Sequence, residues 1–118
     1  MGHTAGVFGA IPAQRQVYKI TQATTAAPAI AYTLENGIDA LATAPTIARA
    51  SAGIYTFTKT GAWTANKTFV KVTPSKATPI ICNVVYTSAD VITLNFSDVA
   101  TPSVADSGDF DMEIAVYA

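Results

Sequence analysis

Short apolar runs, each closed by a turn signal, limit most strongly what this chain can fold into. The clearest run is GIYTFTKT (53–60), in which Tyr55, Phe57 and Lys59 alternate with Ile54 and three threonines. Successive side chains of a β-strand point to opposite faces, so this period of two residues predicts a strand with one buried face. No amphipathic run is long enough to predict a helix of 10 or more residues. The chain is therefore predicted to be all-β.

The same reading predicts about eight short strands. They cover residues 16–22, 29–36, 46–51, 53–60, 67–73, 79–87, 91–97 and 111–118. Asn36-Gly37 is a strong turn signal, because both residues tolerate a positive φ angle. IDALATAP (38–45) fits either one helical turn or a loop. Regular short strands favour a sandwich, jelly roll or barrel over a βαβ arrangement, and we expect a jelly-roll-like antiparallel β-sandwich.

Alternation also predicts which residues form the core. Ile92, Leu94 and Phe96 share one face of their strand, and Met112, Ile114 and Val116 share the inward face of the last one. Tyr55, Phe57 and Phe69 are the expected aromatic anchors of the core. PIICNVVYT (79–87) is apolar on both faces, which predicts a central strand that is covered on both sides.

One domain is the expected organisation. The chain has 118 residues, which is enough for one modest core. Residues 1–15 are rich in Gly and Ala and show no sustained period, so they are predicted to be a flexible N-terminal arm that becomes ordered only on binding. Residues 16–118 are predicted to form a single β-sandwich domain.

Low charge predicts the kind of partner. Charged residues make up 13% of the chain, the net charge is -1, and the seven basic residues are scattered from Arg15 to Lys76. Nucleic-acid binders cluster their basic residues on one face, so no nucleic-acid partner is expected. No apolar run is long enough to span a membrane, and no signal peptide is visible. A neutral surface favours association with other subunits over a soluble monomer.

Most catalytic sites need residues that this chain lacks. His3 is the only histidine and Cys82 the only cysteine, so neither a hydrolase triad nor a zinc site is expected. Cys82 is predicted to pack as a small core residue. A glycosidase pair of carboxylates is a weaker alternative, since so short a domain shows no sign of a deep cleft. We therefore expect no enzyme activity and no cofactor.

Three carboxylates near the C-terminus are the only candidate metal ligands. Asp106, Asp109 and Asp111 lie within six residues, with Asp98 upstream. Carboxylate and backbone oxygens in a loop suit calcium. However, the spacing matches no established calcium loop, and Asp and Gly are also typical of polar turns. The polar turn is the favoured interpretation.

Exposed aromatic side chains could bind a glycan. Trp63 lies at the glycine corner, and Tyr117 and Tyr18 are candidates for outward-facing rings, on which sugars could stack. The alternative is that Trp63 closes one end of the core. We favour this alternative, because a large aromatic residue beside a glycine corner is usually buried.

Several segments resemble one family. These are Leu34-Glu35-Asn36, Gly53 to Thr56, the corner from Thr60 to Thr64, Asn66 to Val70, and the closing strand from Glu113 to Tyr117. Together they resemble small β-sandwich structural proteins of bacteriophages and prophages, especially those of Bacteroidetes. The resemblance covers about two-thirds of the chain and is a pattern of strands and turns. It implies a capsid decoration, head-fibre or tail-associated module, and it carries over no catalytic residues.

The leading hypothesis is thus a non-enzymatic structural protein of the virion, made in the host cytoplasm. It would assemble as a homo-oligomer, such as a trimer, and contact other virion proteins through its sandwich and its arm. One alternative is a carbohydrate-binding module or receptor-binding tip. The other is a filament subunit whose residues 1–15 exchange strands between copies.

Overall fold

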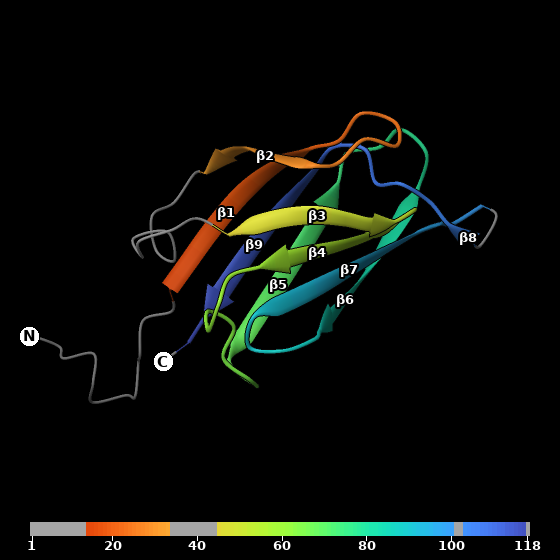
Figure 1. The fold of residues 1–118 in the computed structure, drawn as a ribbon. Coiled ribbons are helices and arrows are strands. Elements are labelled where there is room, and N and C mark those ends of the chain that lie inside the picture. The colour runs from red at the N-terminus through yellow and green to blue at the C-terminus, as the bar shows by residue number, and fades with distance from the viewer. Residues whose placement is uncertain (1–13, 34–44, 101–102, 118) are drawn as a thin grey trace, which may run out of the picture.

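The chain forms two antiparallel β-sheets packed face to face. The computed structural model describes residues 14–33, 45–100 and 103–117, and no helix occurs in these ranges. Nine strands lie in the described residues (Figure 1): β1 Gln14–Thr21, β2 Ala29–Thr33, β3 Thr46–Ser51, β4 Ile54–Thr58, β5 Thr68–Pro74, β6 Ile80–Tyr86, β7 Val91–Asp98, β8 Ser103–Val104 and β9 Phe110–Val116. The prediction of an all-β antiparallel sandwich is confirmed.

The two sheets differ in strand order. Sheet A runs β2-β1-β9-β5, and sheet B runs β3-β4-β7-β6. The two-residue strand β8 pairs with Ser97 and Asp98 at the end of β7. These two residues lie beyond the part of β7 that pairs with β4. Partners come from distant parts of the chain, because β1 pairs with β9 and β4 pairs with β7.

The core fills the space between the sheets and is mostly aromatic and aliphatic. The alternation in β7 and β9 places Leu94 and Ile114 inward, as predicted, and both are fully buried. Aromatic rings pack edge to face and in stacks across the layers, and Tyr18 and Phe57 lie 5.1 Å apart between ring centroids. The largest fully buried side chains are Trp63, Tyr18, Tyr55, Phe57, Phe96, Phe110, Ile20, Ile92, Leu94, Met112 and Ile114.

The GAWTAN segment is a corner between the two sheets, not a hairpin. β4 belongs to sheet B and β5 to sheet A, so the chain crosses from one layer to the other here. Gly61 has a φ angle of 66°, which favours glycine. Trp63 stacks on Phe57, donates its backbone N–H to the carbonyl of Ala89, and accepts a hydrogen bond from the Tyr86 hydroxyl on its own carbonyl. This corner therefore closes one end of the core with the indole.

Three predictions of burial are wrong. Phe69 was expected in the core, but it lies on the outer face of sheet A and is 59% exposed. Tyr18 was a candidate for an outward ring, but it is fully buried, because it shares the inward face of β1 with Ile20. β6 was predicted to be a central strand, but it is an edge strand whose outward residues, Ile81 and Val85, are exposed.

Two predicted features lie outside the described residues. The arm at residues 1–15 overlaps the description only where β1 begins, and Asn36-Gly37 falls in the undescribed range 34–44. The strand predicted at 29–36 is described up to Thr33, as β2.

Candidate functional site

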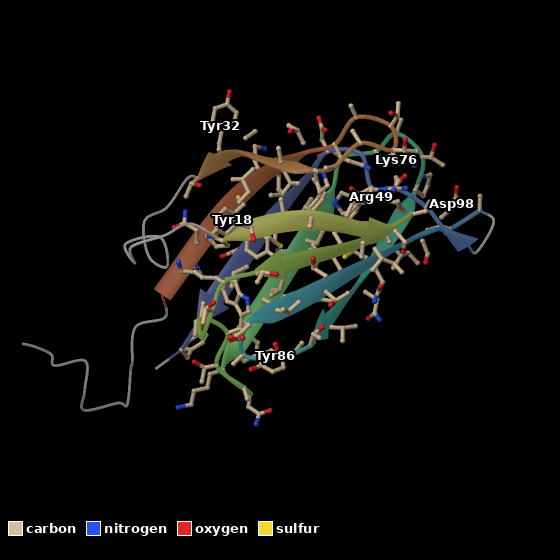
Figure 2. All side chains as sticks on the ribbon, in the orientation of Figure 1. Tyr18, Tyr32, Arg49, Lys76, Tyr86 and Asp98 are labelled. Carbon is tan, nitrogen blue, oxygen red and sulfur yellow. The ribbon has the colours of Figure 1, made fainter. Side chains whose placement is uncertain are left out.

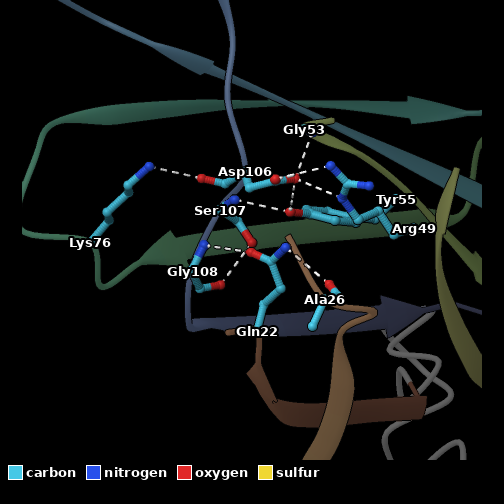
Figure 3. Close-up of polar contacts among 9 residues, drawn as sticks. All are labelled: Gln22, Ala26, Arg49, Gly53, Tyr55, Lys76, Asp106, Ser107 and Gly108. Atoms are coloured by element: carbon cyan, nitrogen blue, oxygen red, sulfur yellow. Dashed lines mark hydrogen bonds and ion pairs between the residues drawn. The ribbon is translucent and has the colours of Figure 1, made fainter. Parts of the chain in front are cut away.

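A cluster of polar residues closes the end of the sandwich opposite Trp63. Its centre is Asp106, in the segment between β8 and β9 (Figure 3). The Arg49 guanidinium donates from Nε to Oδ1 and from Nη2 to Oδ2 of Asp106, both at 3.0 Å. The backbone N–H of Gly53 and the hydroxyl of Tyr55 donate to the same Oδ1 atom, also at 3.0 Å. We call this group, Arg49, Gly53, Tyr55 and Asp106, the end latch.

The latch is joined to sheet A through the residues that follow Asp106. The backbone N–H of Ser107 donates to the Tyr55 hydroxyl at 3.0 Å. The N–H of Gly108 donates to the side-chain oxygen of Gln22, which directly follows β1, at 2.9 Å. The Gln22 amide in turn donates to the carbonyl of Ala26 at 3.1 Å. These contacts link the edge of sheet B to the β1–β2 connection of sheet A.

The hydrogen bonds of the latch keep Asp106 and Arg49 ionised. The bond from Arg49, together with those from Gly53 and Tyr55, lowers the pKa of Asp106 to about 2. The bond to Asp106 raises the pKa of Arg49, and burial raises the pKa of the Tyr55 hydroxyl. A carboxylate that stays ionised and already binds a guanidinium is a poor general acid. The latch is therefore suited to holding the two layers together.

Each of the three candidate calcium ligands bonds to a different residue. Asp106 binds Arg49, Asp109 accepts the backbone N–H of Gln22 at 2.9 Å, and Asp111 forms an exposed ion pair with Lys19. Within the described ranges, no group of three or more His, Cys, Asp or Glu residues is placed to hold a metal ion. The local spacing of these carboxylates reflects the turn into β9 and that strand's alternation.

The two candidate stacking residues have different environments. Trp63 is fully buried, so it offers no ring face to a ligand. Tyr117 is 43% exposed and packs edge to face on Phe69, with ring centroids 5.6 Å apart. Tyr32, which was not singled out from the sequence, is 65% exposed and points away from the body of the domain (Figure 2).

No local sequence signal singles out the exposed rings. Phe69 shares its strand face with Lys71, because residues two positions apart along a strand lie on the same face. However, Phe57 stands in the same relation to Lys59 and is fully buried. Tyr32 lies beside Lys19 only through the pairing of β1 with β2.

On the outer face of sheet B, none of the side chains that the structure describes is charged. Alternation in β4 and β7 turns Tyr55 and Leu94 inward and Thr56 and Thr93 outward. In the register, Ala48, Thr56, Thr93 and Val85 form one row across all four strands. We call this surface the neutral face; it consists of Thr46, Ala48, Ile54, Thr56, Thr58, Ile81, Asn83, Val85, Val91, Thr93, Asn95 and Ser97.

The outer face of sheet A, in contrast, carries charged side chains. Arg15 and Glu113 form an ion pair at 2.9 Å, and Lys19 and Asp111 form another at 2.8 Å. Lys71 lies beside Glu113 in the register. The chain thus separates a charged outer surface from a neutral one, with the core between them.

Cys82 packs at the rim of the core, on β6. It is partly buried against the core cluster, and burial raises the pKa of its thiol to about 12. Such a thiol is unreactive near neutral pH.

Comparison with known proteins adds no further assignment. No helix in the described part of the chain is long and apolar enough to cross a membrane. No family model, curated protein or solved structure matches the chain.

Proposed function

We propose that this protein is a non-enzymatic structural subunit of a bacteriophage particle, and that its neutral face packs against a neighbouring subunit. The observation that carries the proposal is that none of the described side chains on the outer face of sheet B is charged. Charged residues are depleted at the centre of protein interfaces, because their desolvation is rarely compensated. The bacteriophage setting rests on the family resemblance of the strands and turns.

A second copy of the chain is the neighbour that fits best. Two neutral faces bring no like charges together, and Ile81 and Val85 offer exposed apolar surface at the edge strand. Four strands spaced about 4.8 Å apart and about six residues long give a face of roughly 400 Å² in projection. Standard interfaces bury about 800 Å² per partner, so an isolated pair of faces should associate weakly. Weak contacts repeated around a symmetric oligomer or a particle gain avidity.

The polar residues support a structural role over a catalytic one. The latch carboxylate, Asp106, is engaged by Arg49, and the Tyr55 hydroxyl both donates to Asp106 and accepts from Ser107. A group saturated in this way is a stabilising element, because it has neither a free proton nor a free base to offer a substrate.

The oligomeric state tests the proposal directly. Analytical ultracentrifugation over a wide range of protein concentration should reveal a homo-oligomer. Thr56→Lys and Thr93→Lys each place a charge at the centre of the neutral face and should shift the protein to the monomer. Thr73→Lys, at an exposed position of β5 on sheet A, is the matched control and should leave association unchanged.

Two results would contradict the proposal. The first is a monomer at every concentration together with absence of the protein from purified particles. The second is an oligomer that survives both neutral-face substitutions but is lost when residues 1–13, which precede β1, are deleted. That result would instead favour strand exchange through the N-terminal arm.

A further inference from the structure

Three adjoining hollows run along the outer face of sheet A. The first lies between Phe69 and Tyr117, and it shares Lys71 and Glu113 with the second. The second shares Asp111 with the third, which reaches Tyr32. We call this surface the sheet A groove. The hollows measure about 200, 130 and 230 Å³. Each is smaller than the roughly 300–1,000 Å³ of a typical small-molecule site, so an elongated ligand fits the groove better than a compact one.

Exposed aromatic rings stand at both ends of the groove. Phe69 and Tyr117 pack edge to face at an interplanar angle of 88°, which leaves ring surface open to solvent. Tyr32 stands at the opposite end, three strands away and four residues further along the sheet. With a strand spacing of about 4.8 Å and a rise of about 3.4 Å per residue, the two ends are roughly 20 Å apart. A single sugar ring cannot reach both ends, whereas a short linear oligosaccharide can.

Charged side chains fill the middle of the groove. The carboxylates of Glu113 and Asp111 are already paired with Arg15 and Lys19. The third carboxylate, Asp109, lines the hollow near Tyr32 and accepts the backbone N–H of Gln22. By contrast, the Lys71 ammonium forms no ion pair with the described part of the chain, although Glu113 is its neighbour in the register. The floor of the groove therefore presents paired donors and acceptors together with one unpaired cation.

We propose that the sheet A groove binds a linear oligosaccharide that carries an acidic sugar near its centre. The C–H faces of the end sugars stack on Phe69 and Tyr117 at one end and on Tyr32 at the other, as aromatic surfaces favour. Sugar hydroxyls both donate and accept hydrogen bonds, which suits the ion pairs of the floor. The carboxylate of the central sugar meets Lys71.

The composition of the groove favours this ligand over two others. A nucleic acid needs many basic contacts, but the groove holds three carboxylates, Asp109, Asp111 and Glu113, against three cations. A helical peptide needs a continuous apolar surface, whereas this groove interrupts its rings with ion pairs. The groove lies on sheet A and the neutral face lies on sheet B. Glycan binding can therefore be tested independently of subunit assembly.

A glycan array with linear acidic and neutral oligosaccharides tests the proposal on the full chain. At least one uronic acid oligomer should bind, and its affinity is then measured by isothermal titration calorimetry. Phe69→Ala and Tyr32→Ala should each weaken binding about tenfold, as is typical of aromatic anchors that a ligand covers. Lys71→Gln should weaken binding of the acidic oligomer about threefold to fivefold and leave that of a neutral oligomer unchanged.

Val99→Ala is the control, because Val99 is an exposed apolar residue that lies outside both the sheet A groove and the neutral face. All four substituted side chains are exposed, so circular dichroism should show an unchanged fold. Four results would overturn the proposal: an array without binding, a neutral oligomer bound as tightly as the acidic one, binding that is unaffected by Phe69→Ala and Tyr32→Ala, or binding of DNA as tightly as the acidic oligomer.

Discussion

Asp106→Asn should show how much of the domain's stability depends on the end latch. Asparagine keeps the size of the side chain but removes the negative charge and one of the two acceptor oxygens. Arg49 then loses its ion pair, and the buried hydroxyl of Tyr55 and the N–H of Gly53 must share a weaker acceptor. The latch should loosen while the rest of the core keeps its packing.

The magnitude follows from the pKa. The pKa of Asp106 falls from 3.8 to about 2 in the folded protein. At 1.36 kcal/mol per pH unit, this corresponds to about 2.4 kcal/mol, and solvent screening of a side chain that is 15% exposed lowers it to about 2 kcal/mol. With an unfolding entropy of about 2.1 cal/mol/K per residue over 118 residues, the melting temperature should fall by about 8 °C.

The dependence on pH gives the sharper test. A carboxylate whose pKa is lower in the folded state stabilises that state above the unfolded pKa, and this contribution is lost as the pH falls through the folded pKa. The stability difference between wild type and Asp106→Asn should therefore be constant above about pH 4 and shrink between about pH 4 and pH 2. Urea unfolding followed by tryptophan fluorescence at several pH values measures it.

One control and one outcome complete the test. Asp111→Asn removes an exposed ion pair with Lys19 and should cost about 0.5 kcal/mol or less. If Asp106→Asn destabilised the protein equally at pH 2.5 and pH 7, the loss would come from packing. The assignment of the stability to a charged latch would then be wrong.

Three further predictions concern single positions. Gly53→Ala should cost more than about 2 kcal/mol in urea unfolding, because its φ is 72° and a Cβ atom would lie 2.7 Å from a carbonyl oxygen; Gly61→Ala, with a φ of 66° but open space around it, should cost less. Trp63→Ala should cost about 3–5 kcal/mol and Phe69→Ala less than about 1 kcal/mol, and equal values would contradict their burial. Cys82 should react only slowly with a disulfide reagent at pH 8 in the native protein, since the pKa of its thiol is about 12, and the reaction should become fast in urea. A fast reaction of the native protein would refute this.

Alternation along single strands predicted much of the fold. In β7 and β9 the large apolar residues fall on one face, with Val91 the exception, so the inward positions of Leu94 and Ile114 followed from a period of two. The same rule failed for β6, whose PIICNVVYT run is apolar on both faces although the strand lies at an edge. Apolar residues on both faces do not distinguish burial inside a sheet from an exposed contact surface.

The end latch and the groove could not be predicted from local patterns. Arg49 and Asp106 are 57 residues apart, and they meet because β8 pairs with β7 and returns the chain to the start of β4. The groove likewise combines Tyr32 from β2 with Phe69 from β5, which are separated by the two central strands of sheet A. Pairing between distant strands depends on the order of the sheets, and a single sequence does not specify that order.

The position of β9 affects the order in which the domain can fold. β9 is the last described strand, yet it lies in the middle of sheet A and joins the β1–β2 pair to β5. Sheet B needs only β3 to β7, so its strands can pair while the chain is still being synthesised. Until β9 emerges, sheet A is a lone hairpin and an unpaired strand, and the aromatic core is uncovered. The nascent chain should therefore depend on chaperones until β9 has left the ribosome.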